Sequence, residues 1–223
     1  MRNPRRFDRR GVLRAGAALA LAQAASNVRA GSYEDFFLGI ELDRPGIVAP
    51  LLTKGFDVNA RNPESQHGLY LALRENSFEV VPLLLNHPQL DVEATSPAGE
   101  TLLMMAALRG QLDAMKKLIA RGAQVNREGW TPLHYAASGN DQAAVALLLE
   151  RGAQLDARAP NGNTPLMLAA GFGSVDAADL LALRGADATL QNKAGLRAAD
   201  YARKADRLWL AQRLDAIAKR ARP

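Results

Sequence analysis

The sequence predicts an all-α protein, built as a solenoid of about six helix-turn-helix units with protruding hairpin loops. Three observations predict this fold class. A seven-residue line begins with Thr-Pro-Leu at Thr131, returns 33 residues later at Thr164, and has a related copy at Thr101. A glycine lies 21 residues after each of these threonines. Aromatic residues make up only 5% of the chain and hydrophobic residues 48%, which favours Ala- and Leu-rich helical packing over a β-sandwich.

The first 30 residues differ in charge from the rest of the chain. They hold seven arginines and one acid, so residues 31–223 keep 21 bases against 22 acids, a formal net charge of −1. The formal charge of +5 on the whole chain therefore comes from its N-terminal end. Because a nearly neutral body has no electrostatic reason to bind phosphate, we expect no nucleic-acid partner.

Residues 1–30 have the three zones of a secretory signal peptide. A basic segment ends at Arg14, residues 15–25 are apolar, and a short polar end carries Val28 and Ala30 at the positions that a signal peptidase reads. An apolar segment of about 11 residues rises only about 16 Å as a helix, which is too short for a hydrocarbon core of about 30 Å. We therefore expect cleavage near Ala30 and a mature chain without a stable membrane span.

Residues 8–14, DRRGVLR, resemble the bacterial twin-arginine signal. Asp8 stands where that signal usually has Ser or Thr, and Val12 stands where Phe is commoner. The resemblance implies export of the protein to the periplasm. Two alternatives stay open, an ordinary secretory signal with additional arginines, or a basic tail that remains attached to a cytoplasmic regulator.

The repeated line carries a family resemblance. Residues 131–137 read TPLHYAA, and the same unit ends in Gly152-Ala153. In these features the sequence resembles an ankyrin-repeat protein, which implies a monomeric scaffold that binds a protein partner. The two central units carry the pattern most closely, and the first and last are weak, as in the terminal caps of a solenoid. The predicted ankyrin-repeat domain spans residues 31–223, with units at about 34–66, 67–100, 101–130, 131–163, 164–196 and 197–223.

Each unit has the residues that a pair of helices and a loop require. Thr131 can cap the first helix through its hydroxyl, and Pro132 suits the first helical position, where a missing N–H costs nothing. Leucines at positions 147–149 supply the buried stripe of the second helix, and Gly152 can take the left-handed turn that ends it. The polar stretch that follows contains Asn161-Gly162, a tight-turn signal that predicts a hairpin loop.

Two departures from this pattern predict local irregularities. The loop before Thr131 is three residues shorter than the loops before the two units that follow, so it should leave a notch beside Trp130. Pro50 and Pro82 fall inside the second helices expected for the first two units, where each should delay or kink its helix. We therefore expect the two N-terminal units to be the less regular half.

The sequence lacks the residue patterns of a catalytic, cofactor or metal site. It has no cysteine, and its three histidines, His67, His87 and His134, have no metal-ligand spacing. His134 stands at the fourth position of the repeated line, where we expect a structural bond back to the turn around Thr131. We therefore predict a protein that is not an enzyme and holds no cofactor. The alternative is an enzyme or small-ligand protein that uses the notch near Trp130 and His134.

The resemblance also implies where a partner binds. Ankyrin-type stacks use their concave face, made of the hairpin tips, the residue before each first helix and the positions after the paired alanines. Trp130 has a second interpretation, in which it covers the shortened loop and packs on its neighbour. The candidate partner-binding residues carried over to this sequence are Arg74, Leu108, Arg109, Trp130, Ser138, Phe172 and Leu196.

Overall fold

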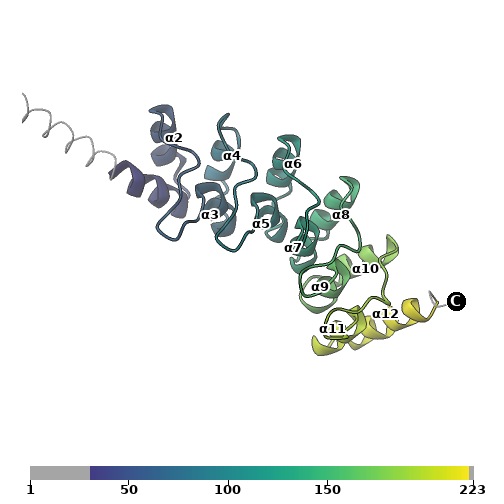
Figure 1. Ribbon diagram of the computed structural model, residues 1–223. Coiled ribbons are helices and arrows are strands. Elements are labelled where there is room, and N and C mark those ends of the chain that lie inside the picture. The colour runs from purple at the N-terminus through teal and green to yellow at the C-terminus, as the bar shows by residue number, and fades with distance from the viewer. Residues whose placement is uncertain (1–30, 221–223) are drawn as a thin grey trace, which may run out of the picture.

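A computed structural model describes residues 31–220, which form one curved row of helix pairs (Figure 1). The predicted signal peptide lies outside these residues. Between residues 31 and 220 the regular elements are helices, and β pairing is limited to two isolated bridges, Arg61 with His67 and Thr95 with Thr101. The predicted all-α solenoid is therefore confirmed. No helix in this range is both long enough and apolar enough to cross a bilayer.

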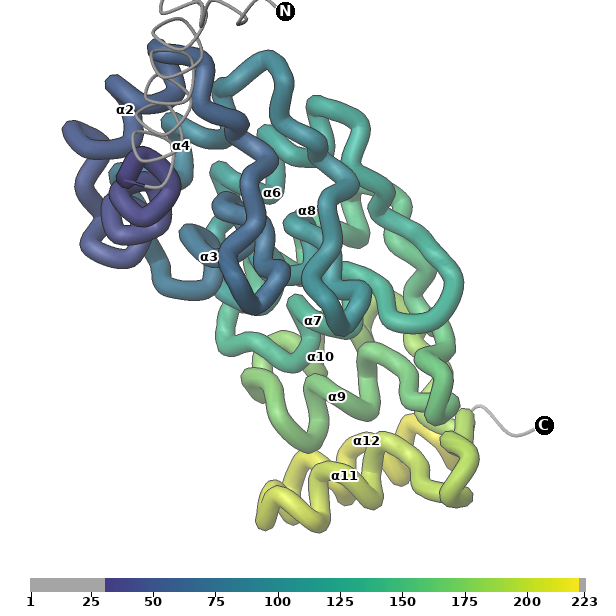
Figure 2. Tube along the Cα trace, turned by 60° about the vertical axis from the view of Figure 1, so that its left-hand side comes forward, coloured from purple at the N-terminus to yellow at the C-terminus, as the bar shows by residue number. Residues whose placement is uncertain are grey.

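The helices alternate between an inner row and an outer row. The inner row lies on the inside of the curve and the outer row on its outside, and the two ends of the stack lie far apart (Figures 1 and 2). Residues 31–41 are helical and precede the first outer helix. The inner helices are α3 (Gly68–Glu75), α5 (Leu102–Leu108), α7 (Pro132–Ser138), α9 (Pro165–Gly171) and α11 (Ala198–Lys204). The outer helices are α2 (Pro45–Thr53), α4 (Val80–Leu85), α6 (Leu112–Ala120), α8 (Gln142–Glu150), α10 (Val175–Leu183) and α12 (Leu208–Arg220).

α7 and α9 begin directly after Thr131 and Thr164, as predicted, and α5 begins in the same way after Thr101. The hydroxyl of Thr101 accepts a hydrogen bond from the backbone N–H of Met104 at 3.2 Å, which satisfies a donor that the first turn leaves unpaired. Pro132 and Pro165 occupy the first positions of α7 and α9, as expected. Gly152, after α8, has a φ of +80°, the left-handed conformation predicted for the end of an outer helix.

Small residues bring neighbouring inner helices close together. The paired alanines of α5, α7 and α9 are all buried in one continuous core. The approach is closer still at two glycines that follow inner helices. A Cβ atom on Gly173 would lie 1.9 Å from the carbonyl oxygen of Ala137, and one on Gly139 would lie 2.7 Å from that of Leu108. Only glycine fits at these two contacts.

Hairpin loops connect the units, with one exception. A backbone hydrogen bond closes each loop before α3, α5, α9 and α11, whereas residues 123–130, before α7, make no such bond. The loop that the sequence predicts to be shortened therefore lacks the hairpin of the others. The closing bonds run from Asn62 N to Gln66 O, Ser96 N to Glu100 O, Ala159 N to Asn163 O and Asn192 N to Leu196 O.

The two prolines in outer helices have different effects. Counted from the first residue of its repeat, α4 begins two positions later than α6, α8 and α10. It begins at Val80 and has six residues, whereas each of the other three has nine. This late start places Pro82 in the first turn, where its missing N–H leaves no hydrogen bond unmade. The predicted delay is thus observed at Pro82. α2 contains Pro50 but begins at the same position in its repeat as α6, α8 and α10, so no delay occurs there.

Candidate partner-binding face

Four of the seven candidate residues line one hollow at the ends of inner helices. Leu108 and Ser138 are the last residues of α5 and α7, Phe172 directly follows α9, and Trp130 precedes α7. The hollow has a volume of about 340 Å³. Its other lining residues are His134, Tyr135 and Leu168.

Helical spacing explains how these side chains converge. Ser138 lies three residues after Tyr135, and Phe172 lies four residues after Leu168, so each pair shares one face of its helix. The sequence analysis missed Tyr135 and Leu168 as lining residues. The same three- and four-residue spacing, counted back from the candidate residues, was a signal that could have found them.

The aromatic rings of the hollow differ in how firmly they are held. Trp130 is 36% exposed and meets the rings of His134 and Tyr135 edge-on, with centroids 5.4 and 6.5 Å apart. It therefore packs on its neighbours and also lines the hollow, at the place where the shortened loop predicted a notch. Phe172 is 63% exposed and has one ring neighbour, Tyr201, at 6.1 Å. An aromatic ring this exposed is available for contact with a partner.

A polar hollow of about 580 Å³ adjoins the apolar one. Leu108 and Ser138 line both, so the two form one continuous surface. In the polar hollow, the Arg109 guanidinium and the Asn140 carboxamide make no hydrogen bond or ion pair with the rest of residues 31–220. The carboxylate of Asp141 is already used, because it accepts the N–H of Ala143 at 2.8 Å. The free guanidinium leaves this half of the surface ready to pair with a carboxylate.

The remaining two candidates lie elsewhere. Arg74, near the end of α3, pairs with Glu75 at 2.8 Å and lines neither hollow. Leu196 is half-buried at the base of the last hairpin, where its N–H donates to the side chain of Asn192 at 3.0 Å. The structure therefore gathers five of the candidate residues and leaves these two apart.

A hydrogen-bonded cluster around Glu100 holds one wall of the apolar hollow. The Glu100 carboxylate accepts from the hydroxyls of Tyr70, of Tyr135 at 3.0 Å and of Ser96 at 3.0 Å. Burial and the bond to Glu100 raise the pKa of Tyr70 to about 12, and burial, with the nearby Glu100 charge, also raises the pKa of Tyr135. Both phenols therefore stay neutral donors. They fix the hairpin before α5 against α3 and α7, and so fix the position of Tyr135.

His134 is fully buried and both of its ring nitrogens are occupied. Nδ1 lies 3.2 Å from the N–H of Thr131, which donates to it, and Nε2 lies 3.1 Å from the carbonyl oxygen of Asn163. The predicted bond back to the turn at Thr131 is confirmed. Burial lowers the pKa of His134, so the ring is a neutral structural link. Between residues 31 and 220, no group of three His, Cys, Asp or Glu side chains could hold a metal ion.

Comparisons with known proteins agree with this architecture. The chain is similar to the nuclear factor NF-kappa-B p105 subunit of Gallus gallus, 32% identical over 174 residues that cover 74% of this chain and 18% of that protein. It is also similar to the B-cell lymphoma 3 protein homolog of Mus musculus, 30% identical over 155 residues that cover 66% of this chain and 35% of that protein. The chain thus spans between about a fifth and about a third of the length of these curated relatives.

A solved structure is similar over nearly its whole length. It is a chain from the complex of a predatory endopeptidase with an immunity protein, from Bdellovibrio bacteriovorus. The TM-score is 0.69 and the identity 28%, with 82% of this chain and 97% of that chain covered. The family described as ankyrin repeats (3 copies) matches residues 38–128 and 103–192. The match covers more than half of this chain, and the structure has the stacked helix pairs that the match implies. This chain therefore belongs to the ankyrin-repeat family.

Proposed function

We propose that the chain is an exported, monomeric, non-catalytic scaffold that binds a protein partner through the two adjoining hollows. The observation that carries the proposal is Phe172, an aromatic ring 63% exposed on the rim of an apolar hollow. Large aromatic side chains and arginines are enriched among the residues that carry most of the binding energy of protein interfaces. In this arrangement the partner inserts an apolar side chain next to Phe172 and presents a carboxylate to Arg109.

Export rests on the N-terminal sequence and fits the fold. The basic, apolar and polar zones of residues 1–30 support a signal peptide, and Arg9-Arg10 supports the twin-arginine route, which carries folded cargo. Stacked repeats contact mainly their neighbours, which favours fast folding before transport. The periplasm is therefore the compartment that we propose.

The similar solved complex suggests a class of partner. It pairs an endopeptidase with an immunity protein, and the matching chain is covered over 97% of its length. An endopeptidase from the same cell is therefore the first partner to test. The alternative of chemistry in the hollow has little support, because both nitrogens of His134 are occupied.

A matched pair of aromatic substitutions tests the binding face. Phe172→Ala removes the rim of the hollow, whereas Trp209→Ala removes an aromatic ring of similar exposure, 53%, from α12. We expect Phe172→Ala to weaken binding of a purified partner by about 30-fold, as for a hot-spot residue, and Trp209→Ala to leave the dissociation constant unchanged. Titration calorimetry measures both. Equal binding by the two variants would remove the hollow from the interface.

Export is tested separately. N-terminal sequencing of the protein from its host should give a start near Gly31, and Arg9→Lys with Arg10→Lys should trap the precursor in the cytoplasm. A start at Met1 in the wild-type protein contradicts export with cleavage. A normal mature product from the double variant contradicts only the twin-arginine route.

A further inference from the structure

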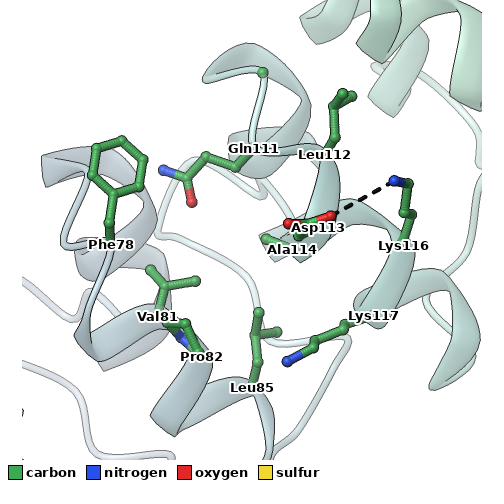
Figure 3. Close-up of a pocket in the computed structure, with 11 residues that line it drawn as sticks. Phe78, Val81, Pro82, Leu85, Gln111, Leu112, Asp113, Ala114, Lys116 and Lys117 are labelled. Atoms are coloured by element: carbon green, nitrogen blue, oxygen red, sulfur yellow. Dashed lines mark ion pairs between the residues drawn. The ribbon is translucent and has the colours of Figure 1, made fainter.

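A second groove lies on the opposite, convex side of the stack, between α4 and α6. Figure 3 shows Val81, Pro82 and Leu85 of α4 on one side of it and Leu112 and Lys117 of α6 on the other. Its volume is about 390 Å³, larger than that of the apolar hollow on the concave side. The groove is not part of the face proposed above.

The groove exists because α4 begins late. Phe78 is the residue of the second repeat that is equivalent to the first residues of α6, α8 and α10. In the second repeat, however, this residue precedes the helix. Because α4 starts two residues late, Phe78 stands outside the helix and is left 63% exposed at the mouth of the groove. Pro82, the residue predicted to delay the helix, lines the groove that the late start leaves.

Cations line the groove and its continuation. Lys116 lies 3.6 Å from Asp113, and the Lys117 ammonium meets only a neutral group, the Asn86 side-chain oxygen, at 3.1 Å. Leu85 and Lys117 also line a further hollow that ends at Arg121, whose guanidinium is fixed on the backbone carbonyls of Leu85 and His87. Three cations and one carboxylate therefore border one apolar channel.

We propose that this groove is a second docking site, which binds an acidic amphipathic segment of a protein. The apolar floor at Val81 and Leu85 would receive leucine-sized side chains, with Phe78 closing over them. Lys116 and Lys117 would pair with carboxylates on the segment, which a basic or neutral segment cannot supply. Arg121, whose guanidinium already donates to four backbone carbonyls, would add positive charge nearby. Gly110 borders both this groove and the polar hollow, so the two sites adjoin at the α5–α6 turn.

The test uses two peptides on the full-length chain. The first is a helix of about 14 residues with leucines along one face and glutamates elsewhere, and the second has lysines in place of the glutamates. We expect the acidic peptide to bind at least about tenfold more tightly, with NMR shifts at the amides of Leu85 and Lys117, and to weaken as salt increases.

Charge-reversed variants locate the site. Lys116→Glu with Lys117→Glu should abolish the preference for the acidic peptide, whereas Lys54→Glu with Lys193→Glu, the same change in net charge on exposed residues elsewhere, should keep it. Equal affinity for the two peptides overturns the proposal, as do shifts confined to the residues around Phe172. Because this assay does not involve the concave face, its failure leaves the proposed function standing, and the Phe172→Ala test decides that function independently.

Discussion

The second and fifth repeats share one plan but stabilise their outer helices differently. In the fifth repeat, the hydroxyl of Ser174 accepts the N–H of Ala177 at 3.1 Å and caps α10 from within the unit. In the second repeat, the capping group comes from the preceding unit. The carboxylate of Asp43 accepts the N–H groups of Glu79 at 3.0 Å and Val80 at 2.9 Å.

The difference shows what an irregular repeat requires. A local cap lets α10 begin at its regular position in the repeat without a capping group from the preceding unit. A cap borrowed from another unit fixes the start of α4 only when the preceding repeat is folded beside it. The second repeat should therefore be more strongly coupled to its neighbour than the fifth, and four measurements test this difference.

The largest effect is expected at the turn between inner and outer helices. Gly173→Ala places a Cβ atom 1.9 Å from the carbonyl oxygen of Ala137, so backbone must move, at a cost of about 3 kcal/mol in the free energy of unfolding. The matching residue of the second repeat, Asn76, has a φ of +60° and no such contact. Asn76→Gly keeps the left-handed backbone and loses the hydrogen bond that Asn76 Oδ1 accepts from the Gln111 side chain at 3.0 Å, so it should cost only about 1 kcal/mol. Urea unfolding followed by circular dichroism measures both, and a mild Gly173→Ala would contradict the close approach.

The second effect is a pH dependence of the free energy of unfolding, and it distinguishes the N-terminal cap of α3 from that of α9. His67 caps α3, with Nδ1 accepting the N–H of Leu69 at 3.1 Å, whereas the fifth repeat uses Thr164. Burial, helped by the charge of Arg61, lowers the pKa of His67 from 6.5 to about 4. Between these values the unfolded chain binds more protons, so stability is complete above pH 6.5 and falls as the pH drops toward 4.

The expected loss from this histidine is about 2 kcal/mol between pH 7 and pH 5. His67→Thr keeps a side-chain cap and removes the titrating ring, so its unfolding free energy should depend less steeply on pH. Urea unfolding of both proteins at the two pH values measures the difference. Identical pH slopes would show that His67 is accessible to protons in the folded chain.

The sequence predicted the features that arise within one repeat. The Thr-Pro starts of α7 and α9, the turn at Gly152, the shortened loop before Thr131 and the bond from His134 to Thr131 all depend on residues close together in the chain. The delay at Pro82 was predicted for the same reason. Contacts between units were harder to predict, because the cap from Asp43 joins residues 36 or more positions apart, and no local pattern marks it.

The candidate site shows the same difference between features that arise within one repeat and contacts between repeats. The positions after the paired alanines predicted Leu108, Ser138 and Phe172, because the helical register repeats. The Glu100 cluster joins the unit at 67–100, which holds Tyr70 and Glu100, to the unit at 131–163, which holds Tyr135. Its assembly therefore depended on the stacking of the units and was missed. Arg109 was predicted from its position in the repeat alone, and only the structure could show that its guanidinium has no hydrogen-bond or ion-pair partner within residues 31–220.

The third effect tests the borrowed cap directly. Asp43→Gly removes the carboxylate without straining the backbone, which has a φ of +50° there, and should cost about 1–2 kcal/mol. Ser174→Ala, which removes the local cap of α10, should cost about 1 kcal/mol. Hydrogen exchange should show loss of protection in both α2 and α4 for the first variant and in α10 alone for the second. Loss confined to α4 in the Asp43 variant would contradict the coupling between the first two units.

The smallest effect separates the two causes of the late start of α4. Pro82→Ala restores an N–H that can bond within a longer helix and loses a residue that restricts the unfolded chain, so stability should change by less than about 1 kcal/mol. If Pro82 sets the start, Cα chemical shifts of residues 78–81 become helical and the convex groove narrows. If they do not change, the cap from Asp43 sets the start. In that case the helical shift should appear only when Asp43→Gly is combined with Pro82→Ala, because both obstacles to an earlier first turn are then gone.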